Sequence, residues 1–251
     1  MNMSKIGSLL AGGALLASLA APALAGDKPI EKTQALNHLQ SQKFKVTITN
    51  VSNPIITSEG ERELKLTPGV WAVHLPTAQL FQAGLPDAGM GLEAIAEMGN
   101  PNSLYSAISN APGVVKADKF ESSYYSWFPS EATPGDGYSF VVEASPGQKL
   151  SFASRVTESN DMFIAPMNGG IDLFDAYGYP MSGDVTNMVS LWDAGTEYNE
   201  IIGEGMNQGV DADDADGLIT YDTIQPVSYT DQGFLFPVAP DLVKVTIEPI
   251  E

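Results

Sequence analysis

The sequence predicts an all-β protein, an antiparallel β-sandwich with one or two short helices. Two observations favour this fold class. Short segments with alternating apolar and polar residues recur along the chain, and turns rich in Gly, Pro, Asn and Asp separate them. Only residues 92–98 have clear helical periodicity. The chain contains no Cys, but a domain of about 200 residues can bury a sufficient core without disulfides.

The first 25 residues have the layout of a secretory signal peptide. Lys5 precedes an apolar run from Ile6 to about Ala21, and Ala23-Leu24-Ala25 forms a small-x-small cleavage site. A membrane anchor needs roughly 20 strongly apolar residues, and this run is short and rich in Ala and Gly. We therefore expect cleavage after Ala25 and export to the periplasm or the extracellular space. We expect no membrane insertion of the mature chain.

The mature chain divides into a polar leader, residues 26–42, and one β domain, residues 43–251. The predicted strands of that domain are Phe44–Asn50, Leu64–Thr67, Val70–His74, Tyr138–Ala144, Lys149–Val156, Met162–Ala165, Val185–Trp192 and Asp241–Ile247. The turn Ser145-Pro146-Gly147 between two of these strands predicts a hairpin of Tyr138–Ala144 with Lys149–Val156.

One helix is predicted over Leu92–Met98. Leu92, Ile95 and Ala96 share a face, and Gly99-Asn100-Pro101 ends the helix. Residues 103–108 suggest a second short helical turn. These are short interruptions in a pattern that is otherwise β.

The charge balance excludes some classes of partner. The chain has 12 Lys and Arg against 31 Asp and Glu, a net charge of −19. Such a surface repels nucleic acid and anionic membranes. It suits divalent cations or basic partners, and solubility alone accounts for most of the acids.

Nucleophilic catalysis has little support in the sequence. There is no Cys, no G-x-S-x-G motif and no zinc-type cluster of His and Cys. The two histidines are His38 in the leader and His74 at a strand end, and we interpret His74 as a polar core or edge residue. We expect no enzyme activity. A hydrolase with paired carboxylates remains an alternative.

Three acids favour a calcium site. Asp193 and Glu197 bracket a turn at Gly195, directly after the apolar pair Leu191-Trp192. Asp161 follows another predicted strand, and loops at one end of a sandwich converge. Ca²⁺ takes six to eight oxygens, mostly from loops, and three clustered acids repel one another without a cation. We therefore expect Asp161, Asp193 and Glu197 to bind Ca²⁺.

The acidic stretch Asp211–Gly217 does not fit an EF-hand loop. Ala215 replaces the third acid, Gly217 comes one position late, and no helix pair flanks the stretch. Two interpretations stay open, a solvated loop and a second, weak calcium site.

The segments Lys149–Met167 and Trp192–Tyr198 together resemble the spondin domain. This domain is the N-terminal extracellular module of F-spondin-type matrix proteins, and it also occurs as a stand-alone secreted protein in bacteria. The resemblance rests on a strand reading L-S-x-A-S, a loop ending in Asp, and D-A-G-T-E in place of D-A-G-T-D. Segments upstream that also fit are Phe44–Val51, His74, Leu80–Gly84 and Gly91–Pro101.

The resemblance implies a C2-related β-sandwich with calcium at one end. It implies Asp161, Asp193 and Glu197 as the ligands, the trio reached above from the residues. Two departures bear on affinity: Glu197 stands where the animal proteins have Asp, and Met162 stands where the family often has an aromatic residue.

The expected function is a secreted calcium-binding module of the adhesion or matrix type, without catalysis. Its partner would be a protein or glycan at the cell surface or in the matrix. A carbohydrate-binding β-sandwich is a further alternative, because Trp71, Trp127, Trp192 and nine Tyr could offer stacking faces.

Overall fold

The computed structural model describes residues 40–87, 89–121, 131–205, 208, 219–227, 230–231 and 234–251. The predicted signal peptide 1–25, residues 26–39 of the leader, Trp127 and the acidic stretch Asp211–Gly217 lie outside the described residues. Within the described part of the chain, no helix is long and apolar enough to cross a membrane.

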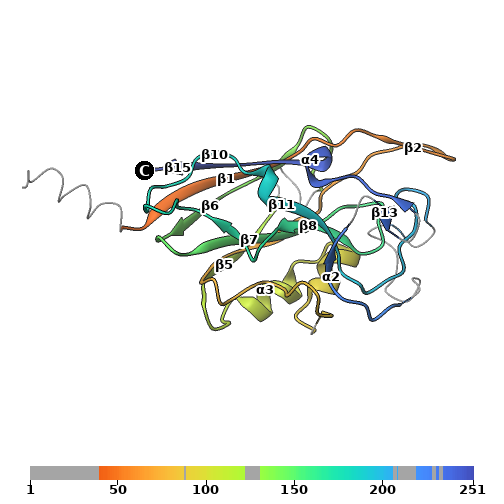
Figure 1. Ribbon diagram of the computed structural model, residues 1–251. Helices are drawn as coiled ribbons and strands as arrows, with labels where there is room; N and C mark the ends of the chain where they lie inside the picture. Colours follow the sequence, from red (N-terminus) through yellow and green to blue (C-terminus); the bar gives the residue numbers. More distant parts are fainter. Residues whose placement is uncertain are drawn as a thin grey trace, which may run out of the picture.

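Two antiparallel sheets form the body of the protein (Figure 1). The smaller sheet has the order β10 (Gly183–Asp184), β15 (Val243–Ile250), β1 (Gln42–Asn50), β6 (Gly137–Ala144). The larger has the order β12 (Gln225–Pro226), β11 (Val189–Asp193), β8 (Met162–Pro166), β7 (Lys149–Arg155), β4 (Gly69–His74), β5 (Val114–Phe120), with β9 (Ile171–Asp172) on β7. Two small ladders stand apart, β2 (Ile55–Thr57) with β3 (Gly60–Arg62) and β13 (Thr230–Asp231) with β14 (Phe234–Leu235). The predicted all-β sandwich is confirmed.

The main core lies between the two sheets. Strand β1 alternates strictly, so that Phe44, Val46 and Ile48 are fully buried and contribute one side of this core. Trp71 of β4 and Phe152 of β7 belong to the same cluster of buried apolar side chains. Period-two alternation on β1 therefore turns one face of the smaller sheet inward and leaves the other in water.

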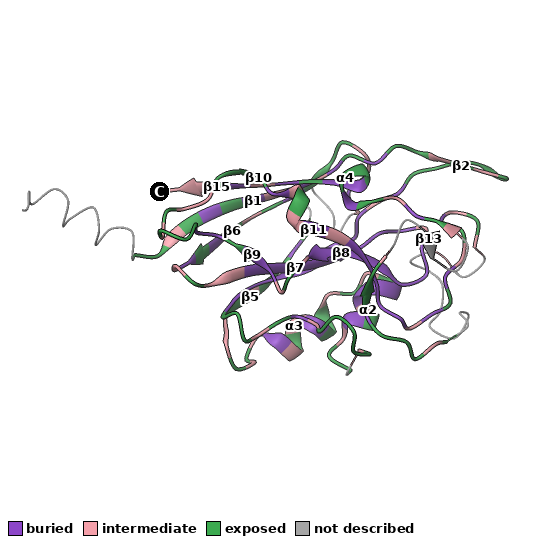
Figure 2. Cartoon of the chain, in the orientation of Figure 1, coloured by how far each residue is buried: buried purple, intermediate pink, exposed green. Residues whose placement is uncertain are grey.

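A second core covers the far face of the larger sheet. Helices α2 (Leu92–Met98) and α3 (Asn102–Ile108) pack there, against side chains such as Ala153 of β7 and Phe163 of β8. Every residue of β4 and β8 is buried, and Figure 2 shows β8 in purple. These strands are apolar at both odd and even positions because both of their faces are covered.

The helix prediction is correct at Leu92–Met98, and Gly99 ends that helix in the left-handed conformation. The described residues contain three short α-helices rather than one or two, because α4 (Ala239–Leu242) precedes β15. A 3₁₀ turn, Thr186–Met188, likewise replaces the start of the strand predicted from Val185.

The predicted hairpin of Tyr138–Ala144 with Lys149–Val156 is wrong. Strand β6 pairs with β1, whereas β7 pairs with β4, β8 and β9, so the turn at Ser145–Gln148 carries the chain from one sheet to the other. Leu64–Thr67 is no regular strand either, because only isolated bridges join Leu66 to Ala132 and to Val156.

A buried asparagine at the end of β1 connects this strand to two loop segments by hydrogen bonds. Asn50, the last residue of β1, donates from Nδ2 to the carbonyls of Leu64 and Ala132, both at 2.9 Å. Its Oδ1 accepts from the backbone N–H and the hydroxyl of Ser52 at 3.0 and 2.7 Å. The four hydrogen bonds satisfy the amide completely. They fix the segment whose Leu66 forms a bridge to Val156, the residue after β7.

Replacing Asn50 should therefore destabilise the fold. Asn50→Ala removes the four buried hydrogen bonds of the amide, although the carbonyls of Leu64 and Ala132 each keep one donor, the Ser52 hydroxyl and the Leu66 N–H. We expect a loss of about 2–4 kcal/mol in the free energy of unfolding. Urea unfolding followed by circular dichroism measures it. Asn110→Ala, which removes an exposed amide, serves as control. Equal midpoints for the two variants would contradict this role of Asn50.

Candidate metal centre

The register of two neighbouring strands brings Asp161 and Asp193 to the same end of the larger sheet. Asp193 is the last residue of β11 and lies opposite Met162, the first residue of β8. Asp161 directly precedes Met162, and its carbonyl accepts a hydrogen bond from the N–H of Ala194 at 3.1 Å. The two acids thus lie on adjacent chains, although 32 positions separate them in the sequence.

The two carboxylate oxygens of Asp161 have different surroundings. Oδ2 accepts from the backbone N–H groups of Thr196 and Glu197 at 2.8 and 3.1 Å, and from the Thr196 hydroxyl at 3.2 Å. Oδ1 is buried and has no hydrogen-bond partner among the described residues. Such an oxygen is costly to bury, so its presence calls for an explanation.

Asp193 has a different set of partners. Its Oδ1 accepts from the backbone N–H of Gly195 at 2.6 Å, and its Oδ2 accepts from Nδ2 of Asn199 at 2.8 Å. The amide oxygen of Asn199 is itself buried and has no hydrogen-bond partner in the part of the chain that the structure describes. Two buried acceptor oxygens without a donor, on Asp161 and Asn199, therefore belong to side chains that both interact with Asp193.

The turn at Gly195 accepts no other residue. Gly195 has φ +71°, and a Cβ placed on it would lie 2.8 Å from the carbonyl carbon of Asp222. The segment behind it is fixed by hydrogen bonds from the Thr220 hydroxyl and the Asp222 N–H to the Gly195 carbonyl, at 2.8 and 2.9 Å. The glycine thus lets the chain reverse close to a second loop and direct its N–H groups at the two carboxylates.

Burial and repulsion both act on Asp161. Burial, and after it the neighbouring charge of Asp193, together raise the pKa of Asp161 to about 7. The hydrogen bonds from Glu197 and Thr196 oppose this rise without cancelling it. Two like charges with little access to water are the arrangement that a bound cation relieves.

Glu197 takes part in another way. Its N–H binds Asp161, and its carboxylate is the acidic charge that acts most strongly on Arg155, opposing the fall in the Arg155 pKa that burial causes. Arg155 is fully buried, and Nη2 donates to the carbonyl of Ser159 at 2.8 Å. Its Nε and Nη1 have no hydrogen-bond partner within the described residues. The structure thus brings Asp161 and Asp193 together and places Glu197 in the field of a buried guanidinium.

Sequence reasoning missed Asn199 and Arg155. Asn199 lies only two residues beyond the D-A-G-T-E motif, so a search for amide as well as carboxylate oxygens could have found it. Arg155 interrupts an apolar strand, L-S-F-A-S-R-V, and a charge in such a strand is itself a sign of an unusual environment.

The donor set fits a hard cation. No group of three or more His, Cys, Asp and Glu in the described ranges is placed to hold a metal ion. The side-chain oxygens brought together here are instead those of two carboxylates and one amide, groups that Ca²⁺ binds. The two oxygens without donors are the specific feature that such an ion would satisfy.

Comparison with known proteins assigns the chain to no family. No family model matches the chain, and no curated protein matches it. The function is therefore argued from the site and from the sequence motifs.

The raised pKa of Asp161 predicts a pH dependence of the metal-free protein. Between the ordinary Asp pKa of about 4 and the folded value of about 7, the folded state binds more protons than the unfolded state. Stability should therefore fall as the pH rises through this window. Thermal melts in chelator at several pH values measure it. The fall should be shallower in Asp161→Asn, and identical slopes would contradict the assignment.

Proposed function

We propose that this protein is a secreted calcium-binding module of the spondin type, which binds a partner at the cell surface or in the matrix and catalyses no reaction. The observation that carries the proposal is the pair of buried oxygens, Asp161 Oδ1 and Asn199 Oδ1, without donors among the described residues. Both belong to side chains that interact with Asp193.

Calcium would have a structural role at this site. Asp161, Asp193 and Asn199 would supply side-chain oxygens, and Glu197 is the further acid in reach of the same turn. The ion would neutralise the repulsion between two buried carboxylates and hold the loop before β8 against the loop after β11. Those loops form one end of the sandwich, where a partner can bind.

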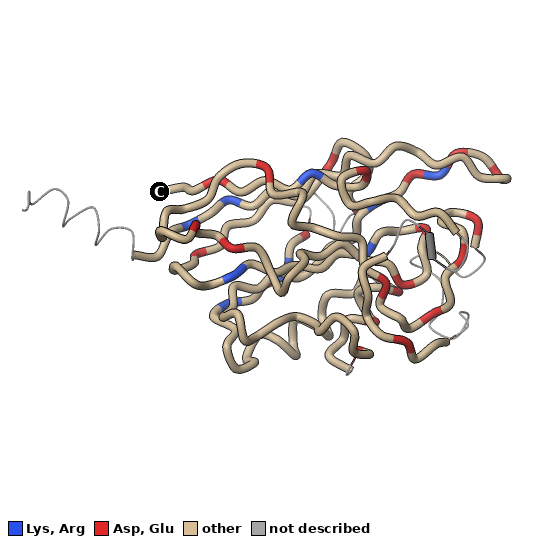
Figure 3. Tube along the Cα trace, viewed as in Figure 1, with Lys and Arg blue, Asp and Glu red and all other residues tan. Residues whose placement is uncertain are grey.

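The sequence motifs support the same proposal. The two segments that resemble the spondin domain, Lys149–Met167 and Trp192–Tyr198, run along the adjacent strands β7, β8 and β11. The predicted signal peptide would export the chain, and extracellular modules bind calcium with dissociation constants of about 0.1–1 mM. Figure 3 shows acidic segments gathered in the loops at the end that carries β2 and β13, a surface that favours a cationic or calcium-bridged partner.

The acid-pair hydrolase gains no support from the geometry. Asp161 and Asp193 are 0% and 3% exposed, and their oxygens accept hydrogen bonds from the surrounding loop. A glycosidase pair must face a sugar from two sides of an open cleft. This pair has no such access.

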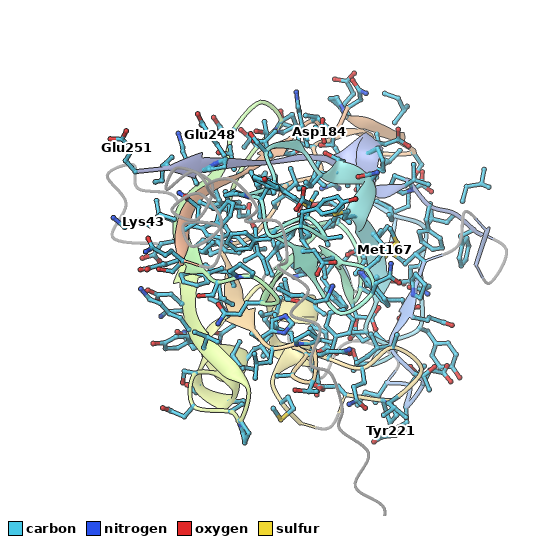
Figure 4. The ribbon with its side chains drawn as sticks, turned by 60° about the vertical axis from the view of Figure 1, so that its left-hand side comes forward. Lys43, Met167, Asp184, Tyr221, Glu248 and Glu251 are labelled. Carbon is cyan, nitrogen blue, oxygen red and sulfur yellow. The ribbon has the colours of Figure 1, made fainter. Side chains whose placement is uncertain are left out.

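Calcium should stabilise the mature protein, residues 26–251. Calorimetry should show about one saturable site, and calcium at 100 times its dissociation constant should add about 2.7 kcal/mol to the free energy of unfolding. Asp193→Ala should abolish both effects, and Asn199→Ala should weaken binding. Glu248→Gln removes an exposed charge near the C-terminal end of β15 as control, and Figure 4 shows Glu248 close to the chain end at Glu251. A full calcium response in Asp193→Ala would refute the site.

A second variant separates the ion's effect from simple damage to the fold. Asp161→Asn removes the buried charge and places an N–H₂ donor where the oxygen without a partner stands. In chelator at pH 8 this variant should be more stable than the natural protein by on the order of 1–3 kcal/mol. The same variant should lose the calcium response. Lower stability in chelator would show that Asp161 is not repelled by Asp193.

A further inference from the structure

A cavity of about 560 Å³ lies apart from the carboxylates of the metal centre. Its walls come from the loop Gln79–Ala83, the end of β8 with the turn after it, Trp192 of β11 and Pro226 of β12, and Ser151 of β7 also lines it. The volume is within the range of sites for small molecules. Met167, one of the lining residues, is labelled in Figure 4 well away from Glu248.

Among the residues that the structure describes, no charged side chain lines this cavity, although the chain has 31 acids. Its polar groups are neutral: the amides of Gln79, Gln82 and Asn168, which are exposed, and the hydroxyl of Ser151. Phe81 and Trp192 form part of the apolar wall, with ring centroids 4.9 Å apart. A site of this composition selects a neutral ligand that has both an apolar face and hydrogen-bonding groups.

The direction of the hydrogen bond at Ser151 can be worked out. His74 is fully buried, with Nδ1 2.8 Å from the carbonyl of Leu75 and Nε2 2.8 Å from Oγ of Ser151. A carbonyl only accepts, so Nδ1 carries the proton. Burial lowers the pKa of His74, which keeps the ring neutral and leaves Nε2 as an acceptor. The Ser151 hydroxyl must therefore donate to His74, and the oxygen offers the cavity only lone pairs.

Gly170 packs closely against the His74–Ser151 pair. This residue has φ +119°, and a Cβ on it would lie 2.9 Å from Ser151 Oγ and 3.1 Å from His74 Nε2. Any side chain would push against the pair and the adjoining backbone. The acceptor that faces the cavity is thus fixed by its surroundings, and a ligand must supply the donor.

We propose that this cavity binds a neutral sugar residue. A sugar hydroxyl would donate to Ser151, other hydroxyls would bond to the amides of Gln79, Gln82 and Asn168, and a C–H face would lie on the aromatic wall. The proposal deepens the proposed function by naming a glycan as the class of partner, and rests on it only for the exported location.

The test is a titration of the mature protein with neutral disaccharides, namely maltose, lactose, cellobiose and diacetylchitobiose. The indole N–H resonance of Trp192, identified with Trp192→Phe, reports on the cavity by NMR. At least one disaccharide should shift it saturably, while the indole of Trp71, buried in the other core, stays unchanged. Ser151→Ala and Gln79→Ala should each weaken binding about two- to tenfold, as expected for one lost hydrogen bond to the ligand. Asn110→Ala should not.

Gln79→Ala keeps the test decisive if Ser151→Ala disturbs the fold, because Gln79 is exposed. The proposal is overturned if no disaccharide moves the Trp192 resonance up to tens of millimolar, or if both variants bind as the natural protein does. A shift caused by short peptides and by no sugar also overturns it. The titration is run both with calcium and in chelator. A protein that binds calcium but no sugar refutes only this inference, whereas a protein that binds sugar but no calcium refutes only the calcium site.

Discussion

The burial of Asp161 beside Asp193 is the constraint on which this end of the molecule depends. Strands β8 and β11 are neighbours inside the larger sheet, and their ladder ends at the pair Asp193 and Met162, which fixes the backbone of both acids at one end of the sheet. The N–H groups of Thr196 and Glu197 hold one oxygen of Asp161 and thereby fix the loop after β11. The two carboxylates repel each other, and for stability alone a neutral side chain at this buried position would be more favourable.

Other features follow from the same constraint. The chain must reverse at once after Asp193, and only a glycine at 195 fits against the segment 219–224. Arg155 supplies a positive charge inside the core on the Glu197 side, where it offsets part of the acidic field. The centre is therefore asymmetric, with a guanidinium serving Glu197 and, in our proposal, a calcium ion serving Asp161 and Asp193.

The sequence predicted the local features and missed the long-range ones. Alternation in residues 44–50 and the glycine after Met98 define β1 and α2, because both depend on nearby residues. Alternation shows which face is buried but not which strand is the neighbour, so β6 and β7 were paired wrongly. Asp161 and Asp193 could be found as acids after strands. The contact of His74 with Ser151 spans 77 positions, and no local pattern marks it.

The metal centre and the cavity meet at two consecutive residues of β11. Successive side chains on a strand point to opposite faces, so Trp192 belongs to the helix-covered core and Asp193 turns the other way. The indole is held by its own hydrogen bond, from Nε1 to the carbonyl of Ala165 at 3.0 Å. An ion at Asp193 would therefore act on the cavity through the position of the strand end and not through the ligand. Ala165, which accepts the hydrogen bond of Trp192, and Met162, which lies opposite Asp193, both belong to β8. The cavity wall and the metal centre therefore share this strand as well as β11.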